Sequence, residues 1–180
     1  SYTQDLDILK KITIGALVHD VGKAAIAKNV LEKKGKLTDT GMKLIRKHCV
    51  IGAEMIADMF DKEVQQIVLM HHEKLDGSGY FRGLKGDELT RPQRIVAVAD
   101  IISALYGKRS YKEAFAPDKI KAIIQADADN NKICPAVVDV AVKNMESIIR
   151  NFEKKKEAVL GTYMQIKKQE NDIYEQFKGL

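Results

Sequence analysis

The sequence of 180 residues has no tryptophan, only eleven tyrosines and phenylalanines together, three prolines and two cysteines. Neither Cys49 nor Cys134 belongs to a Cys-x-x-Cys pair, which excludes a zinc ribbon or a disulfide framework, and we expect two reduced packing residues. No apolar run approaches the ~20 residues that cross a bilayer, and no charged-then-apolar signal segment opens the chain. The sequence therefore predicts a soluble, cytoplasmic protein without a membrane segment.

The net charge of +5 comes from lysines that are interleaved with acidic residues. Runs such as residues 33–36 and 154–156 are typical of solvated helix faces. No aromatic platform or basic-aromatic motif accompanies them, so we do not expect binding to a nucleic acid polymer. A small anionic ligand is compatible with this charge.

Apolar residues make up 45% of the chain and recur at helical spacing, with no strand pattern and no internal repeat. We predict an all-α fold, with one domain over residues 1–150 and a charged helical extension over residues 151–180. The first helix is expected over residues 4–20 and ends near Gly22. Its predicted apolar face consists of Leu6, Leu9, Ile12, Ala16 and Leu17.

Further helices are marked by their start signals. Thr38 is a predicted N-cap, and Thr90 with Pro92 opens a helix that carries Asp100 on an otherwise apolar surface. A helix over residues 63–72 delivers His71 and His72 into a loop that holds four of the twelve glycines, namely Gly77, Gly79, Gly83 and Gly86. Since glycine allows positive φ and close backbone approach, this loop is predicted to face a ligand.

All four histidines (His19, His48, His71 and His72) and two aspartates (Asp20 and Asp100) fall at predicted helix ends or on apolar helices. Buried ionisable groups must be paired or bound. Imidazole and carboxylate together form the ligand set of iron, manganese, zinc and similar divalent metals. The residues alone favour a metal site over a set of satisfied polar groups in the core.

Residues 19–23, His-Asp-Val-Gly-Lys, resemble the signature of the HD superfamily of metal-dependent phosphohydrolases. Residues 71–84, His-His-Glu-Lys-Leu-Asp-Gly-Ser-Gly-Tyr-Phe-Arg-Gly-Leu, resemble the signature of its HD-GYP branch, and residues 94–100 and 109–112 continue the resemblance. The similarity spans about residues 8–142. It implies an all-helical HD-domain bundle with extra C-terminal helices.

The resemblance also implies a function, namely the hydrolysis of cyclic di-GMP or a related cyclic dinucleotide to pGpG and GMP. The reaction would use two or three divalent metals, commonly iron or manganese, and a hydroxide that bridges them. By the family pattern, His19, Asp20 and Asp100 hold one metal, and Asp20 also bridges to a second that His48, His71 and His72 hold. Lys23 stabilises charge on the phosphate. Gly79 and Tyr80 shape the substrate side, and Arg109 and Lys112 grip the phosphates.

The sequence departs from the family pattern at several places. The family's first helix, which supplies one more histidine, is absent, so we expect an N-terminally truncated or divergent member. Phe81 replaces the proline of Gly-Tyr-Pro, Ser103 stands at the place of a second aspartate, and Cys134 lies in a region that usually reads Phe-Asp-Pro.

Besides the cyclic dinucleotide phosphodiesterase, two other classes of function stay open at this point. A degenerate HD-GYP module could bind metal or cyclic dinucleotide without turnover and act as a signalling domain. A nucleotide phosphohydrolase of the wider superfamily is a third class. The sequence is also compatible with an upstream sensory domain and with a homodimer formed through the C-terminal helix.

Overall fold

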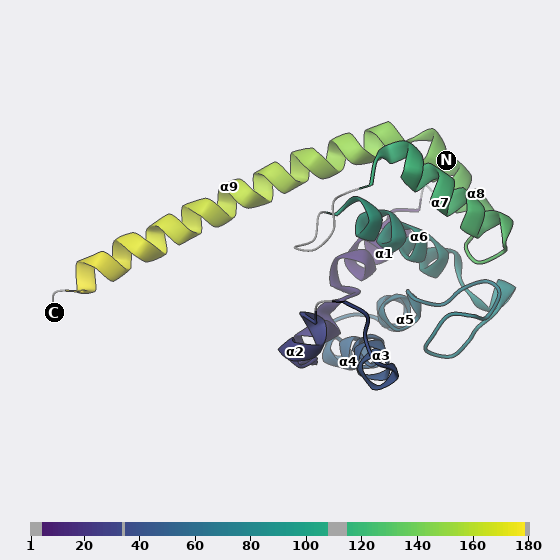
Figure 1. The fold of residues 1–180 in the computed structure, drawn as a ribbon, viewed down its shortest axis with the longest axis horizontal. Helices are drawn as coiled ribbons and strands as arrows, with labels where there is room; N and C mark the ends of the chain where they lie inside the picture. The colour runs from purple at the N-terminus through teal and green to yellow at the C-terminus, as the bar shows by residue number, and fades with distance from the viewer. Residues whose placement is uncertain (1–4, 34, 108–114, 179–180) are drawn as a thin grey trace. The chain divides into compact units, whose positions relative to one another are not determined.

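The computed structural model describes residues 5–33, 35–107 and 115–178. Over these residues the chain is helical and contains no strand, apart from one isolated β-bridge between Asp76 and Lys85 (Figure 1). The all-α prediction is confirmed. No helix in these ranges combines the length and the apolar character that crossing a bilayer requires.

The helices follow one another with short connections. They are α1 (Leu6–Val18), the 3₁₀ turn η1 (Val21–Ala25), α2 (Lys28–Leu31), α3 (Asp39–Arg46), α4 (His48–Met55), α5 (Lys62–Met70), the 3₁₀ turn η2 (Gly86–Glu88), α6 (Arg91–Tyr106), α7 (Pro117–Asp129), α8 (Pro135–Lys143) and α9 (Met145–Phe177). The Thr38 side chain accepts a hydrogen bond of 3.1 Å from the Gly41 N–H, which confirms the predicted cap. Pro92 lies in the first turn of α6, as predicted.

The chain divides into two compact units, residues 1–140 and 141–180. The predicted domain boundary at residue 150 stays a prediction, because compactness alone does not show that either unit folds independently. The residues of the predicted site that the structure describes all belong to the first unit.

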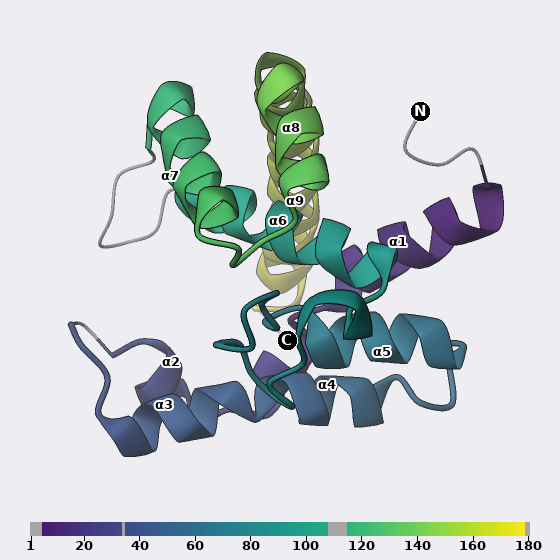
Figure 2. The same ribbon diagram turned by 90° about the vertical axis from the view of Figure 1, so that its right-hand side faces the viewer.

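In the first unit, α5 is the central helix. It packs against α1, α4 and α6, and α4 also packs against η1 (Figure 2). Val64 and Val68 of α5 meet the buried Ile56, and Ile14 and Val18 of α1 close this cluster. These contacts fix the ends of α1, α4 and α5 relative to one another, and the histidines lie at those ends.

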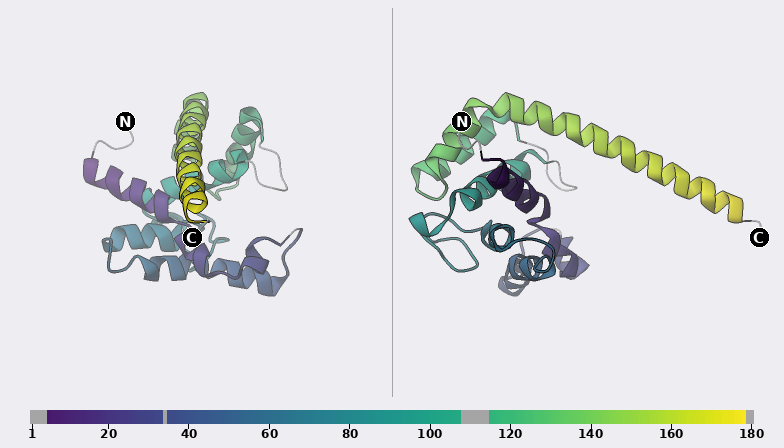
Figure 3. Two further views of the ribbon diagram at one scale, coloured as in Figure 1. Left: turned by 90° about the vertical axis from the view of Figure 1, so that its left-hand side faces the viewer. Right: turned by 180° about the vertical axis from the view of Figure 1, so that it is seen from behind.

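The predicted apolar face of the first helix is wrong at its three leucines, while its other two residues are partly buried. Leu6 is 73% exposed, Leu9 40% and Leu17 83%. The face that packs on α5 contains Gly15, where an added Cβ would lie 2.6 Å from Cγ2 of Ile67. Because glycine allows this close approach, α1 turns a different side toward the core than a count of large apolar residues indicates. The left panel of Figure 3 shows α1 beside α5 from the side opposite to Figure 2.

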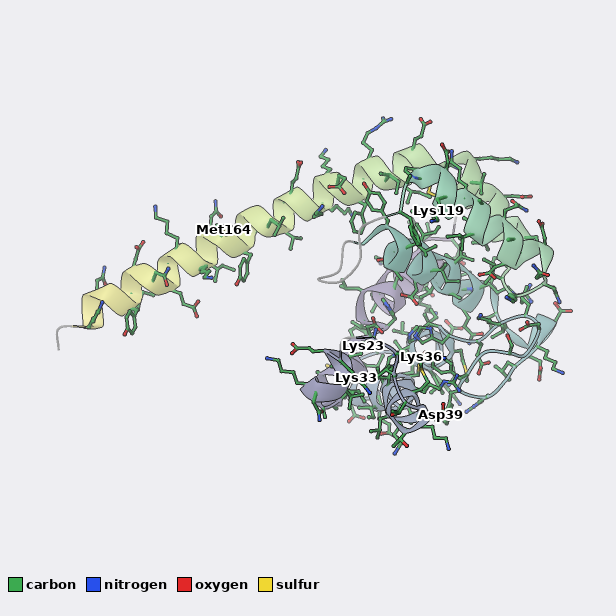
Figure 4. All side chains as sticks on the ribbon, in the orientation of Figure 1. Lys23, Lys33, Lys36, Asp39, Lys119 and Met164 are labelled. Atoms are coloured by element: carbon green, nitrogen blue, oxygen red, sulfur yellow. The ribbon has the colours of Figure 1, made fainter. Side chains whose placement is uncertain are left out.

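The second unit consists mainly of α9. The segment from Phe152 onward is helical, as predicted, although the helix begins earlier, at Met145. Several of its large apolar side chains are exposed, including Val159, Tyr163, Met164 and Ile166. Figure 4 labels Met164 on this helix. Dimerisation through this helix stays a prediction.

Candidate metal centre

The four histidines converge from three places in the chain. His19 directly follows α1, His48 opens α4, and His71 and His72 follow α5. The ring centroids of His71 and His72 lie 4.1 Å apart, and those of His19 and His48 lie 4.9 and 5.2 Å from the centroid of His71. Residues separated by more than fifty positions therefore form one cluster, as the sequence predicts.

Three of these rings are oriented in the same way by the backbone. The Nδ1 atoms of His19, His48 and His71 lie 2.7, 2.6 and 2.6 Å from the carbonyl oxygens of the residues three positions earlier, Ala16, Ile45 and Val68. A carbonyl can only accept, so Nδ1 carries the proton and donates it. This assignment leaves the Nε2 lone pair of a neutral ring free for a metal ion, which is the usual arrangement around metal-binding histidines.

The free nitrogens face one another without a proton between them. Nε2 of His48 lies 3.2 Å from Nε2 of His71, and both atoms are acceptors in this tautomer. Two acceptors at this separation repel each other unless a proton or a cation lies between them. The geometry is thus suited to a cation that both nitrogens can bind.

Asp20 lies between two groups of ligands. Its Oδ1 is 3.3 Å from Nε2 of His48 and 3.8 Å from Nε2 of His71. Its Oδ2 is 3.3 Å from Nε2 of His19 and 2.5 Å from Nζ of Lys23. The two oxygens of one carboxylate thus serve different partners, as a carboxylate that bridges two cations does.

Asp100 completes the cluster from α6. Its Oδ1 lies 3.4 Å from Nε2 of His19, and its Oδ2 lies 3.7 Å from Nδ1 of His72. The predicted partner His19 is therefore beside Asp100. His72, which the family pattern assigns to the second metal, also borders this carboxylate and joins the two halves of the cluster.

Burial decides the charge of His48, His71 and His72. It lowers the pKa of His71 to about 3, aided by repulsion from His72, and it lowers the pKa of His72 to about 4. Burial likewise lowers the pKa of His48. These three rings are therefore neutral at physiological pH, which is the protonation state that a metal requires.

At His19 the neighbouring carboxylates have a larger effect on the pKa than burial has. Burial disfavours its charged form, but Asp100 and Asp20 outweigh burial and raise the pKa of His19 to about 10. Burial also opposes ionisation of Asp20, but His19 and Lys23 hold the pKa of this carboxyl well below its usual range. The proton on His19 is the one that a divalent cation would displace on binding.

Two buried atoms of the cluster have unmet hydrogen-bonding capacity. Nε2 of His19 and Oδ1 of Asp20 have no hydrogen-bond partner of acceptable geometry, although Oδ2 of Asp20 lies 3.3 Å from the first atom and Nε2 of His48 lies 3.3 Å from the second. Buried polar atoms without partners are costly, and such atoms in a functional site indicate an ion or water that binds there. Together with the donor set, they fit divalent cations.

Cys49 borders this cluster. Its thiol is buried, packs with Leu69 and Met70, and lies 3.5 Å from Nε2 of His48. Burial raises its pKa to about 12, so the sulfur is a neutral thiol. Cys134 is also buried and free, and both cysteines are reduced packing residues, as predicted.

The role predicted for Gly22 as the end of the first helix is wrong. The helix ends four residues earlier, at Val18, and Gly22 lies in the turn η1. A Cβ there would lie 2.1 Å from the carbonyl oxygen of His48 and 2.5 Å from the Gly52 nitrogen. Glycine is required at this position because η1 packs directly on the backbone of α4.

The glycine-rich loop places Tyr80 against the cluster. The Tyr80 ring lies 4.7 Å from the His72 ring, with an angle of 34° between the planes. Gly79 allows this, because a Cβ there would lie 2.5 Å from the backbone of Glu73 and Lys74. The structure thus brings both predicted substrate-side residues next to the histidines.

Two residues beside the site were not predicted to have a role. The Arg46 guanidinium lies 4.8 Å from the centroid of the Tyr80 ring, and Glu73 is a carboxylate with only 2% exposure. Glu73 had a signal in the sequence, since it directly follows the two histidines. Arg46 had none, because it occurs on the polar side of α3. The predicted phosphate ligands Arg109 and Lys112 lie outside the described residues.

The HD domain family model matches residues 3–137 of this chain. The chain is 43% identical over 118 residues to the cyclic di-GMP phosphodiesterase response regulator RpfG of Xanthomonas campestris, an alignment that covers 64% of this chain and 31% of the relative. It is 39% identical over 142 residues to a cyclic di-GMP phosphodiesterase of Vibrio cholerae, with 74% and 29% covered. It is also 32% identical to 3'3'-cGAMP-specific phosphodiesterase 1 of Vibrio cholerae, with 79% and 33% covered.

Among solved structures, an HDG"Y"P protein from Bdellovibrio bacteriovorus has a similar fold. The TM-score is 0.64 and the sequence identity is 21%, with 79% of this chain and 45% of that chain covered. The chain spans about a third of the length of the curated relatives that it matches.

Proposed function

Because this chain belongs to the HD domain family, as its HD-GYP signature predicts, we propose that it is a metal-dependent phosphodiesterase that opens cyclic di-GMP to pGpG and onward to GMP. The observation that carries this proposal is the position of Asp20, whose two oxygens face different ligand groups. A bridging carboxylate between two cations is the arrangement used for phosphoester hydrolysis.

We assign the ligands from the family pattern, which these contacts support. His19, Asp20 and Asp100 would hold one cation, and His48, His71 and His72 with Asp20 would hold the second; iron and manganese suit this mixture of imidazole and carboxylate. Bound divalent cations supply an acidified water molecule and positive charge that faces the phosphate. The carbonyl groups behind His19, His48 and His71 keep these rings in one tautomer and orientation.

The substrate side carries cations and an aromatic ring. Lys23 is partly exposed beside Asp20 and stabilises negative charge that develops on the phosphate. Tyr80 offers a ring next to His72, and the backbone at Gly79 holds that ring in place. Arg46 adds a positive charge over the Tyr80 ring, and we propose that this charge attracts the anionic substrate. Arg109 and Lys112 are proposed to bind phosphate as well.

The test is an assay of the metal-loaded protein. After loading with ferrous iron or manganese without oxygen, the protein is incubated with cyclic di-GMP and, separately, with 3'3'-cGAMP, and the products are separated by chromatography. We expect pGpG or GMP, with no product after treatment with a chelator. If the protein retains metal but cleaves neither substrate, the result contradicts the proposed enzymatic activity. The alternative, a module that binds metal or cyclic dinucleotide without turnover, is then favoured.

Arg46→Ala is expected to raise KM for the cyclic dinucleotide about tenfold, which is the scale of one lost charge-assisted contact, with the metal content unchanged. Steady-state kinetics measure the effect. The control is Lys43→Ala, which removes an exposed basic residue from the same helix. Equal KM values for the two variants would exclude Arg46 from the substrate side.

A further inference from the structure

The glycine-rich loop between α5 and α6 is bound from inside by one carboxylate. Oε1 of Glu73 accepts hydrogen bonds from the backbone N–H groups of Arg82 and Gly83, at 2.5 and 3.1 Å. Oε2 accepts another from the Leu84 N–H, at 3.1 Å. All three donors belong to the loop, nine to eleven residues farther along the chain. We infer that Glu73 is a positioning residue, which holds this loop in the conformation that keeps Tyr80 on the His72 ring.

The burial of Glu73 makes the interaction strong. The residue is 2% exposed, in a place where water does not compete for the carboxylate. A carboxylate that accepts hydrogen bonds from backbone N–H groups forms charge-assisted bonds, which are about twice as strong as neutral ones. Without the carboxylate, three N–H groups would lose their partner.

The other contacts of the loop explain how this hold reaches Tyr80. The Tyr80 N–H donates to the carbonyl oxygen of His72 at 3.2 Å, and Gly79 lies against the backbone of Glu73. The loop thus folds back over the three residues His72, Glu73 and Lys74. His72 is a proposed metal ligand, and Glu73 fixes the returning segment 82–84.

The far end of the loop has a separate anchor. Arg94 of α6 donates to the carbonyl oxygens of Leu89 and Gly86, at 2.8 and 2.9 Å. These bonds attach η2 to α6 and do not involve segment 82–84. Arg94 therefore cannot replace Glu73 as the hydrogen-bond partner of the N–H groups of segment 82–84.

The inference has a structural part and a catalytic part. The structural part concerns the order of the loop and can be measured in the metal-free protein. The catalytic part, the effect on substrate binding, rests on the proposed phosphodiesterase. The metal ligands are held by other elements, so we expect the metal content to be retained when the loop loosens.

Hydrogen exchange followed by mass spectrometry tests the structural part. In Glu73→Ala, amides 82–84 are expected to exchange about tenfold faster or more, which is the scale of one lost charge-assisted bond, while amides of α4 and α5 stay protected. Glu73→Gln keeps one acceptor oxygen, so we expect an intermediate effect; this milder variant also serves if the alanine variant does not fold. Unchanged exchange of amides 82–84 in both variants would overturn the inference.

Glu88→Gln is the matched control. Glu88 also accepts a backbone hydrogen bond in this loop, from the Lys85 N–H at 2.8 Å, but it is exposed. In this variant, the hydrogen exchange of the amides near Tyr80 is expected to match that of the wild type. An equal acceleration of amides 82–84 in this control would show a general loosening and would count against a specific role for Glu73.

Kinetics test the catalytic part. In Glu73→Gln, KM for cyclic di-GMP is expected to rise about tenfold, the scale of one lost charge-assisted bond, with a smaller change in kcat and unchanged metal content. A parallel loss of metal and kcat at constant KM would overturn the positioning role. If the wild type itself cleaves no dinucleotide, the proposed function fails, and the exchange data still decide whether Glu73 orders the loop.

Discussion

Replacing Asp20 by alanine is expected to lower kcat by about 10³-fold or more and to remove at least one of the two proposed cations. The reason is that Asp20 is a ligand of the cations that stabilise negative charge at the reacting phosphate. No other side chain of the described chain contacts His19, His48, His71 and Lys23 together. Its removal takes a ligand from both halves of the cluster. Metal content, measured by mass spectrometry, and turnover of cyclic di-GMP are expected to fall together.

Two further variants separate charge from size. Asp20→Asn keeps the shape of the side chain but loses the negative charge, so we expect the same loss of metal. Asp58→Ala removes an exposed carboxylate of the same unit and is expected to behave as the wild type. Turnover of Asp20→Ala at the wild-type rate would overturn the two-cation mechanism.

The cluster of histidines and aspartates could be predicted from the sequence because its residues break the local pattern. His19, Asp20 and Asp100 are ionisable groups on or beside apolar helices, where only a partner or a ligand stabilises them. Such a signal is local and needs no knowledge of the fold. The pairing of Asp20 with both ligand groups comes from the resemblance, and the structure supports it with distances.

The orientation of α1 could not be predicted in the same way. A sequence pattern counts large apolar residues, and by that count Leu6 and Leu17 mark the core face. The structure buries Gly15 instead, because contact between two helices depends on how closely their backbones approach. The identity of the partner helix decides this, and the partner lies fifty residues farther along the chain.

The same reason explains why Arg46 was missed and why the role of Gly22 was misjudged. Arg46 lies on the polar side of α3, and only the folded loop brings Tyr80 beneath it. Gly22 follows the first helix, where glycine usually ends a helix. In the structure its function is a contact with α4. Both are tertiary effects that no local pattern contains.

Gly22→Ala is expected to destabilise the protein by about 3 kcal/mol or more, because the new methyl group overlaps backbone atoms that cannot rotate away. The nearest of these is the carbonyl oxygen of His48, and the next belong to Gly52. Relief requires a shift of α4 away from η1. Urea unfolding of the metal-free variant, followed by circular dichroism, measures the loss.

The same shift would also damage the metal centre, because α4 begins at His48 and η1 follows Asp20 directly. These two side chains approach to 3.3 Å, so a small separation of the two elements moves a ligand away from the bridging carboxylate. We therefore expect weaker metal binding even at temperatures where the variant is folded. Gly41→Ala is the control, because the nearest atoms to its Cβ belong to side chains and not to the backbone: Cδ2 of Leu37 at 3.2 Å and the Thr38 hydroxyl at 3.4 Å. Its stability should stay within about 1 kcal/mol of the wild type. Equal stability and metal affinity of the two variants would show that the contact between Gly22 and α4 does not position His48.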